Sequence, residues 1–205
     1  MEQRVFTSEI FQPIVPLEEI KYDSLSDVDL WEAFKKGDEG AFIRIYNTYF
    51  EALCDFGVQY VSLNIVEDAV QDLFIDLRKK RHKLPRIKNT IRLFLFQCLK
   101  RRILNILKKE NEMGKENIHD LRFGITPCHE SVIILNQDQQ IKLQKLDKAL
   151  ASLSERQREA VYYYFYKGMT YEEVQELLDF KDIKSARNLI YKVVGTLRKN
   201  FSIFF

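Results

Sequence analysis

The sequence lacks the residue groups from which metal sites, disulfides and most catalytic centres are built. Its cysteines, Cys54, Cys98 and Cys128, lie far apart and include no Cys-x-x-Cys pair. The three histidines have no ligand spacing, so we interpret His129 beside Cys128 as a linker residue and expect reduced cysteines. A glycine-rich phosphate loop and a Ser/His/Asp arrangement are also missing. We therefore expect no metal, no cofactor, no small-molecule substrate and no enzymatic activity.

Long apolar runs are missing as well. No stretch approaches the roughly 18 to 20 apolar residues that a membrane span requires. Residues 1–16 do not have the charged-then-apolar layout of a signal peptide, so we expect a cytoplasmic protein. Only four prolines and seven glycines occur among 205 residues, whereas 46% of the residues are hydrophobic and 30% are charged. This composition is typical of a folded, helix-rich protein.

Acidic residues are absent from one long segment. Between Arg78 and Lys109 the sequence holds thirteen Lys or Arg residues and no Asp or Glu, although the net charge of the chain is only +2. We call residues 78–109 the basic segment. Such a block is typical of a surface that binds a polyanion. The alternative is a solvated basic face, which normally mixes charges of both signs.

Apolar residues recur at helical spacing along most of the chain, and no alternating strand pattern is evident. Ser26 or Asp27 is expected to cap a short helix that Gly37 ends, and Asp38 is expected to cap the next helix. The sequence therefore predicts an all-α protein.

Two more helix starts are predicted before residue 110. Asn64 with Glu67 three residues later indicates a capping box. After a loop at residues 82–90, Asn89 or Thr90 is expected to cap a long helix that carries the end of the basic segment.

The helical segments are expected to form two small domains joined by a flexible linker. Residues 110–139 lose the helical period and contain glycine and proline, which is typical of a linker. The linker is acidic, because residues 110–138 hold six Asp or Glu against one Lys and one Arg. It separates a helical domain at residues 24–109 from another at residues 140–205. Residues 1–23 are expected to be an N-terminal extension.

The second domain has the layout of a helix-turn-helix. A short helix over residues 170–178, a turn over 179–182 and a longer helix over 183–199 are predicted. An ordinary amphipathic helical hairpin is the alternative, since Asp179 replaces the glycine often found in such turns. Two capping boxes are predicted at helix starts in this domain: Ser154 with Gln157, and Thr170 with Glu173.

The longer helix of this motif has two distinct faces. Its apolar face consists of Ala186, Leu189, Ile190, Val193 and Leu197. Its polar face consists of Lys184, Arg187, Asn188 and Tyr191. Because Arg can bind guanine bidentately, Asn can bind adenine and Lys can bind phosphate, the polar face suits a reader of the DNA major groove.

The first domain presents two contrasting helices. The helix after the loop has an apolar face at Leu95, Leu99, Ile103 and Ile106 and a polar face at Gln97, Arg101, Asn105 and Lys108. The preceding helix is acidic on its exposed side, at Glu67, Asp68, Gln71, Asp72 and Asp76. The helix dipole accounts for the first two acids but not for the later ones, so we expect a protein partner on this side.

Several of these segments resemble the sigma-70 family of RNA polymerase sigma factors, in particular its extracytoplasmic-function group. Residues 66–78 (Val-Glu-Asp-Ala-Val-Gln-Asp-Leu-Phe-Ile-Asp-Leu-Arg) resemble the polymerase-binding helix of sigma region 2, and residues 38–42 (Asp-Glu-Gly-Ala-Phe) resemble the opening of the same domain. Residues 153–159 and 168–174 resemble region 4, and residues 185–192 resemble its recognition helix. The order and spacing of these motifs are more specific than any one of them.

The resemblance implies a sigma factor that binds core polymerase and directs promoter recognition, DNA melting and transcription initiation. It implies a polymerase-binding surface at Glu67, Asp68, Gln71, Asp72 and Phe74. It implies contacts with the minus-ten element from Arg86, Lys88, Asn89, Arg101, Asn105 and Lys108. It implies contacts with the minus-thirty-five element from Lys184, Ser185, Arg187, Asn188 and Lys192, and we expect Tyr191, on the polar face of the same helix, to contact DNA as well. Arg101 stands where the family often has Asn, and Asn105 where it often has Asp, so the bases read there stay open.

The implied partners are the polymerase core, through its β′ clamp and β flap, promoter DNA, and an anti-sigma factor, which can be membrane-bound. The acidic linker would run toward the polymerase active-site channel. Two other classes remain as alternatives. One is a helix-turn-helix repressor or activator that binds duplex operator DNA without polymerase. The other is an interaction protein that binds polymerase or a sigma partner without reading DNA, against which the basic segment argues.

Overall fold

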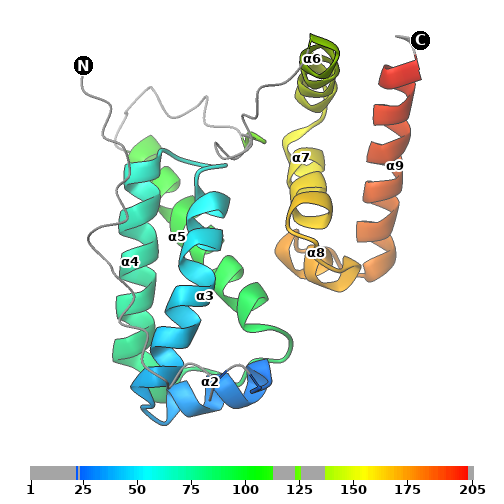
Figure 1. Ribbon diagram of the computed structural model, residues 1–205. Coiled ribbons are helices and arrows are strands. Elements are labelled where there is room, and N and C mark those ends of the chain that lie inside the picture. Colours follow the sequence, from blue (N-terminus) through cyan, green and yellow to red (C-terminus); the bar gives the residue numbers. More distant parts are fainter. Residues whose placement is uncertain (1–21, 23, 113–122, 126–136, 203–205) are drawn as a thin grey trace.

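The computed structural model describes residues 22, 24–112, 123–125 and 137–202, and every regular element in this part of the chain is helical (Figure 1). The predicted all-α class is therefore confirmed. No helix within the described ranges is both long and apolar enough to cross a membrane. The first group of helices comprises α2 (Asp27–Lys35), α3 (Glu39–Gly57), α4 (Leu63–Lys80), a 3-10 turn (Arg81–Lys83) and α5 (Ile91–Glu112). The second comprises α6 (Gln137–Ala151), α7 (Glu155–Val161), a π-helical turn (Tyr162–Tyr166), α8 (Tyr171–Leu177) and α9 (Ile183–Ser202).

The predicted N-caps of the first two helices are confirmed in the structure. The Ser26 hydroxyl accepts a hydrogen bond from the backbone N–H of Asp29, and the Asp38 carboxylate accepts one from the N–H of Ala41. Gly37 has a φ of 102°, a left-handed conformation that lets the chain turn between α2 and α3 without strain. These two starts are therefore local events that the sequence specifies.

The capping box predicted at Asn64 and Glu67 is wrong. The helix α4 begins earlier, with Ser62 at the N-cap and no side-chain cap bond. Its first turn closes through the Val66 N–H and the Ser62 carbonyl, 3.1 Å apart. The reason is tertiary: Val66 is fully buried against Gly57 of α3, where an added Cβ would come within 2.5 Å of the valine side chain. The close approach of α3 and α4 sets where α4 starts.

The loop after α4 is tied to the bundle through Trp31 on α2. The indole is completely buried, and its Nε1–H donates to the Pro85 carbonyl oxygen at 2.9 Å. Its ring also meets Phe94 of α5 edge-on, with centroids 4.9 Å apart. The predicted start of α5 is confirmed at Thr90, whose hydroxyl accepts from the Leu93 N–H. One tryptophan thus holds the loop against the first turn of α5.

Both capping boxes predicted in the second group are present. Ser154 pairs reciprocally with Gln157 at the start of α7, and Thr170 with Glu173 at the start of α8. The turn between α8 and α9 contains Asp179 with a φ of 51°. Aspartate tolerates this conformation better than most residues, so it can take the place of the usual glycine. The predicted helix-turn-helix layout is therefore confirmed.

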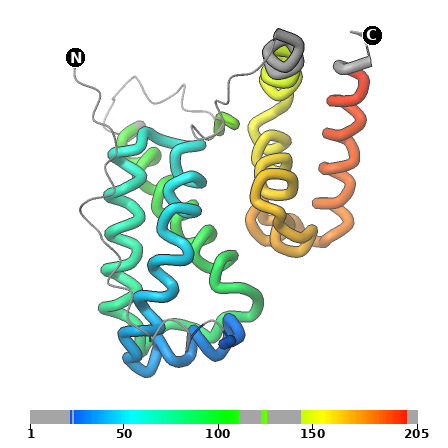
Figure 2. The backbone as a smooth tube through the Cα atoms, viewed as in Figure 1, coloured from blue at the N-terminus to red at the C-terminus, as the bar shows by residue number. Residues whose placement is uncertain are grey.

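The two helical groups, which Figure 2 shows beside each other, share one buried core. The ring centroids of Phe56 in α3 and Tyr163 lie 5.9 Å apart. The Tyr60 and Tyr163 hydroxyls form a buried hydrogen bond of 2.7 Å. Phe123, from the predicted linker, is 0% exposed and packs on Tyr60, Tyr162 and Tyr163. At the ends of the predicted 110–139 linker, residues 110–112 belong to α5 and residues 137–139 to α6. Between these helices the structure describes residues 123–125, and the remainder of the linker prediction lies outside the described residues.

Candidate nucleic-acid interface

The helix α9 presents the polar face that its sequence predicts. Ala186, Ile190 and Val193 are buried against the rest of the second group. The aspartate before the helix, Asp182, accepts a hydrogen bond from the Ser185 N–H at 2.8 Å and so fixes the first turn. The predicted contact residues on the outer face are exposed, apart from the half-buried Ser185: Lys184, Arg187, Asn188, Tyr191 and Lys192. The structure therefore places all six on one accessible helix.

Arg187 is held on this face by aromatic rings that sequence reasoning did not single out. Its guanidinium lies 5.1 Å from the centroid of the Tyr171 ring, which stacks on Tyr164 at 4.8 Å. The hydrogen bond with Tyr164 raises the pKa of Tyr171 to about 12, so this phenol stays neutral. A cation over an aromatic face gains about 0.5 to 1 kcal/mol at an exposed site. The Tyr164–Tyr171 stack thus orients the arginine that we expect to read a base.

A second candidate surface lies where the loop meets α5. Arg86, Lys88 and Asn89 are exposed along this loop. Beside them is a pocket of about 220 Å³ whose wall includes Gln97 of α5 and Glu176 of α8. The amides of both Asn89 and Gln97 donate hydrogen bonds to the Glu176 carboxylate. The loop predicted to contact the minus-ten element therefore forms a pocket, and a residue of the second helical group lies in it.

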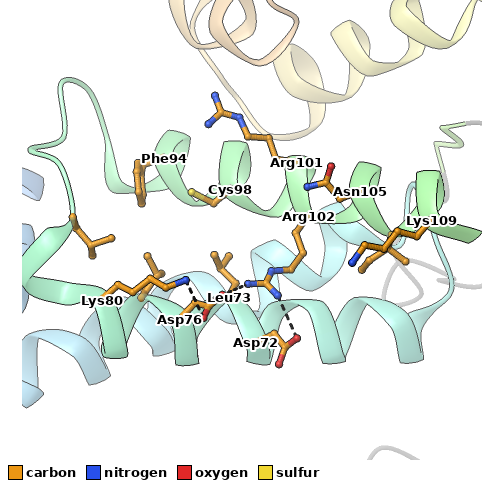
Figure 3. Close-up of a pocket in the computed structure, with 13 residues that line it drawn as sticks. Asp72, Leu73, Asp76, Lys80, Phe94, Cys98, Arg101, Arg102, Asn105 and Lys109 are labelled. Carbon is orange, nitrogen blue, oxygen red and sulfur yellow. Dashed lines mark hydrogen bonds and ion pairs between the residues drawn. The ribbon is translucent and has the colours of Figure 1, made fainter.

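Further along α5 the two adjacent arginines have different roles. Arg101 is exposed and points away from α4, whereas Arg102 reaches across a cavity of about 590 Å³ toward α4 (Figure 3). Its guanidinium pairs with Asp72 at 3.2 Å and with Asp76 at 2.5 Å. The hydrogen bond from Arg102 lowers the pKa of Asp76 below its usual value. Arg102 is thus engaged within the fold, which leaves Arg101 with the exposed Asn105 and Lys108 as the candidate DNA contacts.

The acidic face of α4 is only partly as predicted. Asp68, Gln71 and Asp72 are exposed and Glu67 is half-buried, so these four form a polar surface. Phe74 does not belong to it. The ring is 2% exposed and contacts the rings of Tyr46 and Phe42, because a helix with this apolar stripe must turn Phe74 inward. The assignment of Phe74 to an exposed docking surface is therefore wrong.

Two cations of the basic segment make ion pairs with the second helical group. Arg92 contacts Glu173 at 2.8 Å, and Lys100 contacts Glu159 at 2.7 Å. Both carboxylates belong to largely buried residues, and Lys100 also donates to the Leu177 carbonyl oxygen. Sequence reasoning missed these pairs. The available signal was an acidic residue near the apolar face of a short helix, which is unusual unless it is paired.

Metal-ligating and thiol groups were also located in the described part of the chain. It contains no group of three or more His, Cys, Asp or Glu residues placed to hold a metal ion. Burial raises the pKa of the Cys54 thiol to about 11 and raises that of Cys98 as well. Thiols with raised pKa values are poor nucleophiles at neutral pH. The arrangement is suited to binding polyanions and protein surfaces.

Comparison with known protein families gives a match within the second helical group. Residues 143–191 match the family described as Sigma-70, region 4, and this segment contains the helix-turn-helix of α8 and the first half of α9. No curated protein matches the sequence.

Two solved structures share the fold. One is CnrH in complex with the cytosolic domain of CnrY, with a TM-score of 0.57 and 16% identity over 86% of this chain and 97% of that chain. The other is the sigma factor RpoE in complex with the anti-sigma factor NepR from Bartonella quintana, with a TM-score of 0.57 and 20% identity over 79% of this chain and 97% of that chain. The likeness extends over both helical groups.

Proposed function

We propose that this chain, whose residues 143–191 match region 4 of the sigma-70 family, is an RNA polymerase sigma factor of the extracytoplasmic-function type. In this role it binds core polymerase and directs promoter recognition, DNA melting and initiation. One observation carries the proposal: the region 4 match falls on a helix-turn-helix whose outer face is exposed and bears Lys, Arg and Asn side chains, which are able to contact bases and phosphates. We assign residues 24–109 to region 2, 110–139 to the linker and 140–205 to region 4.

Polymerase would dock on α4 and DNA on α5 and α9. The exposed acids Asp68 and Asp72 suit a basic protein surface such as a clamp helix of the β′ subunit, while region 4 would contact the β flap. The α9 face would read the minus-thirty-five element in the major groove. The loop and Arg101, Asn105 and Lys108 would contact the minus-ten element. Two separate DNA surfaces on one chain fit a promoter that has two separated elements.

An anti-sigma factor is the expected regulator. The RpoE structure contains the anti-sigma factor NepR, and the CnrH structure contains the cytosolic domain of CnrY. We propose that this chain is controlled in the same general way by a protein that covers its polymerase or DNA surfaces. We also propose that the partner can be membrane-bound; the partner in one of these complexes is the cytosolic domain of CnrY.

The decisive experiment mixes the full-length chain with core polymerase. We expect the two to co-elute in size-exclusion chromatography and, on genomic DNA of the host, to start transcripts at a defined set of sites with two shared upstream elements. Core polymerase alone provides the control. Tight and specific binding of a duplex site by the chain alone, without co-elution, would instead identify a repressor or activator. Co-elution without any promoter-specific transcript would identify an interaction protein that does not read DNA.

A second experiment addresses DNA melting. Arg101→Ala combined with Lys108→Ala should reduce open-complex formation, followed by permanganate reactivity of unpaired thymines, more than closed-complex binding at low salt. Removing one phosphate-binding cation should lower the salt dependence of binding by about 0.9 in slope on duplex and about 0.7 on single strands. The matched control is Arg102→Ala, which removes an arginine from the same turn that is engaged with α4. Equal defects in both variants would argue against a direct DNA role for Arg101.

A further inference from the structure

The helix α2 contacts both ends of the loop that leads into α5, and Figure 1 shows it lying across that end of the bundle. At the start of the loop, the Trp31 indole Nε1–H donates to the Pro85 carbonyl oxygen at 2.9 Å. At its end, the Asp27 carboxylate accepts a hydrogen bond from the Ile91 backbone N–H at 2.8 Å. Asp27 and Trp31 are four residues apart, so both lie on one face of α2. One turn of a helix thus fixes the two points between which residues 86–90 run.

The bond from Asp27 is a helix cap that another helix supplies. The first N–H groups of α5 have no partner within the helix, and the buried Ile91 carries one of them. The Thr90 hydroxyl accepts the N–H of Leu93, and the Asp27 carboxylate accepts that of Ile91. A carboxylate at this end of a helix also interacts favourably with the helix dipole. The spacing of the sequence allowed Asp27 to cap its own helix, but Ser26 occupies that position and Asp27 caps α5 instead.

Trp31 lies behind the loop pocket of about 220 Å³ and is not among the residues that line it. The pocket walls include Pro85 and Phe94, and Trp31 contacts both of these residues. The indole is 0% exposed, so close packing holds it in one place, and its two contacts set the distance between these walls. The loop also bonds to α8 through Asn89 and Thr90, whereas the contacts with α2 lie within the first helical group.

We propose that Asp27 and Trp31 are positioning residues, which fix the shape of the loop pocket and thereby the choice of the base that the pocket accepts. The inference rests on the proposed function, because it concerns how the surface for the minus-ten element is held in its binding shape. Neither side chain touches DNA in this role. Both act through the backbone of the loop, whose exposed residues Arg86, Lys88 and Asn89 are the candidate contacts.

A loop that is held in one shape discriminates between bases better than a mobile loop does. Ordering a loop at the moment of binding costs free energy, and a loop that is fixed beforehand avoids this cost. A mobile loop adapts to several bases alike, whereas a fixed loop fits one base and leaves polar groups unpaired when it meets another. Loss of an anchor should therefore weaken binding of the preferred base and leave binding of the other bases nearly unchanged.

The first measurement follows the loop in the full-length chain without DNA or polymerase. Trp31 is the only tryptophan of the sequence, so its indole N–H gives one resonance in the nuclear magnetic resonance spectrum of the isotope-labelled chain. Exchange of this proton with solvent requires opening of its bond to the Pro85 carbonyl oxygen. Asp27→Ala removes the other anchor and should speed this exchange by about fivefold, as expected for the loss of one helix cap. Asp27→Asn, whose amide oxygen is still an acceptor for the Ile91 N–H, should restore most of the protection.

The second measurement uses the holoenzyme that the full-length chain forms with core polymerase. Promoter templates carrying each of the four bases at each position of the minus-ten element compete for the holoenzyme, and the initiated transcripts are counted. We expect Asp27→Ala to reduce the base preference by about fivefold at one position only, and Asp27→Asn to regain most of it. The matched control is Asp29→Ala, which removes the same charge from an exposed position in the same first turn of α2.

The combined outcomes decide the inference. Faster indole exchange with a loss of base preference at one position, in Asp27→Ala and not in Asp29→Ala, supports the positioning role. Unchanged exchange overturns it, since Asp27 would then not anchor the loop. Faster exchange with an unchanged base preference also overturns it, because the contacts would then support the fold alone. Equal losses at every position, or the same effects in Asp29→Ala, overturn it as a general weakening of the first helical group.

Trp31→Phe tests the other anchor independently. The variant keeps an aromatic ring beside Phe94 and removes the donor to the Pro85 carbonyl oxygen. It should lose base preference at the same position as Asp27→Ala, and a loss at a different position would overturn the common role of the two residues. Asp27 is only half-buried, so its variants keep the test informative even where Trp31→Phe lowers stability.

Failure of the inference and failure of the proposed function give different results. If the wild-type chain starts no promoter-specific transcripts with core polymerase, the proposed function fails, and the choice of a minus-ten base is overturned with it. If the wild-type chain initiates with a base preference that Asp27→Ala retains, the sigma role stands and the positioning role alone is overturned.

Discussion

Phe123 is the residue whose removal should most directly separate the two helical groups. Its side chain is 0% exposed, and its ring centroid lies 4.9 Å from that of Tyr60 in the first group. In the second group it lies 5.5 Å from Tyr162 and 6.4 Å from Tyr163. The ring therefore fills space between the groups and is not part of the interior of either bundle. We expect Phe123→Ala to weaken their association while each bundle keeps its own core.

The magnitude follows from burial. Replacing a buried Phe by Ala costs about 3 to 5 kcal/mol in a protein core, through reduced transfer energy and the cavity left behind. A loss of about 3 kcal/mol, the lower value, would shift the equilibrium toward the separated groups by roughly 150-fold. The backbone hydrogen bonds of this segment, such as that from the Gly124 N–H to the Gln59 carbonyl oxygen at 3.0 Å, do not involve the ring, so the substitution does not remove them directly.

The assay is thermal unfolding followed by calorimetry, combined with small-angle X-ray scattering. The wild-type chain should unfold in one main transition, and Phe123→Ala should show two transitions and a larger radius of gyration at 25 °C. Phe123→Leu, which keeps most of the apolar volume, is the control and should stay close to wild type. If Phe123→Ala kept a single transition and the same radius of gyration, the two groups would not depend on this ring, and the reasoning would fail.

Three further predictions concern single positions. Asp68→Lys should weaken binding to core polymerase at unchanged helical content, measured by a pull-down and circular dichroism; undiminished affinity would count against the α4 surface. Arg187→Ala should cost about 1 to 3 kcal/mol and relax specificity at one base pair, whereas Lys192→Ala should weaken all promoters alike, as competition binding can show. Gly57→Ala should destabilise the first helical group by about 1 to 3 kcal/mol in urea unfolding, since its Cβ would overlap a buried side chain of α4. A neutral result there would mean that α3 and α4 can move apart freely.

The division of α9 into a buried face and an exposed face could be predicted from residue spacing alone. In α9 the positions of Ala186, Ile190 and Val193 repeat at helical intervals, so whichever core they enter, Arg187 and Asn188 must face outward. Phe74 was assigned to the polymerase-binding surface by its place in a motif and not by its spacing, and its side chain is buried. An apolar side chain in the middle of an amphipathic stripe goes to the core, as its periodicity already indicated.

The loop pocket, with Glu176 in its wall, could not be predicted. The sequence places Asn89 and Gln97 in the first helical group and Glu176 in the second, with no signal that links them. The composition of the predicted linker indicated two separate domains, so contact between them was not predicted. In the structure Phe123 lies in a core that both helical groups share. A single aromatic residue in a polar segment carries no periodicity, so no pattern could identify it.

The sequence by itself determined the local features of this protein. Helix starts at Ser26, Asp38, Ser154 and Thr170, the helix-turn-helix and the division of α9 into two faces all depend on hydrogen bonds and apolar spacing within a few residues. Only the tertiary structure decided which charges are available for a partner. Arg101 and Arg102 are adjacent in the sequence but differ in role, because Arg102 forms ion pairs with carboxylates on α4. The helix α8 lies beside the loop because apolar contacts and ion pairs form between segments that are far apart in the chain. Such contacts depend on distances in space, which residue spacing along a chain does not encode.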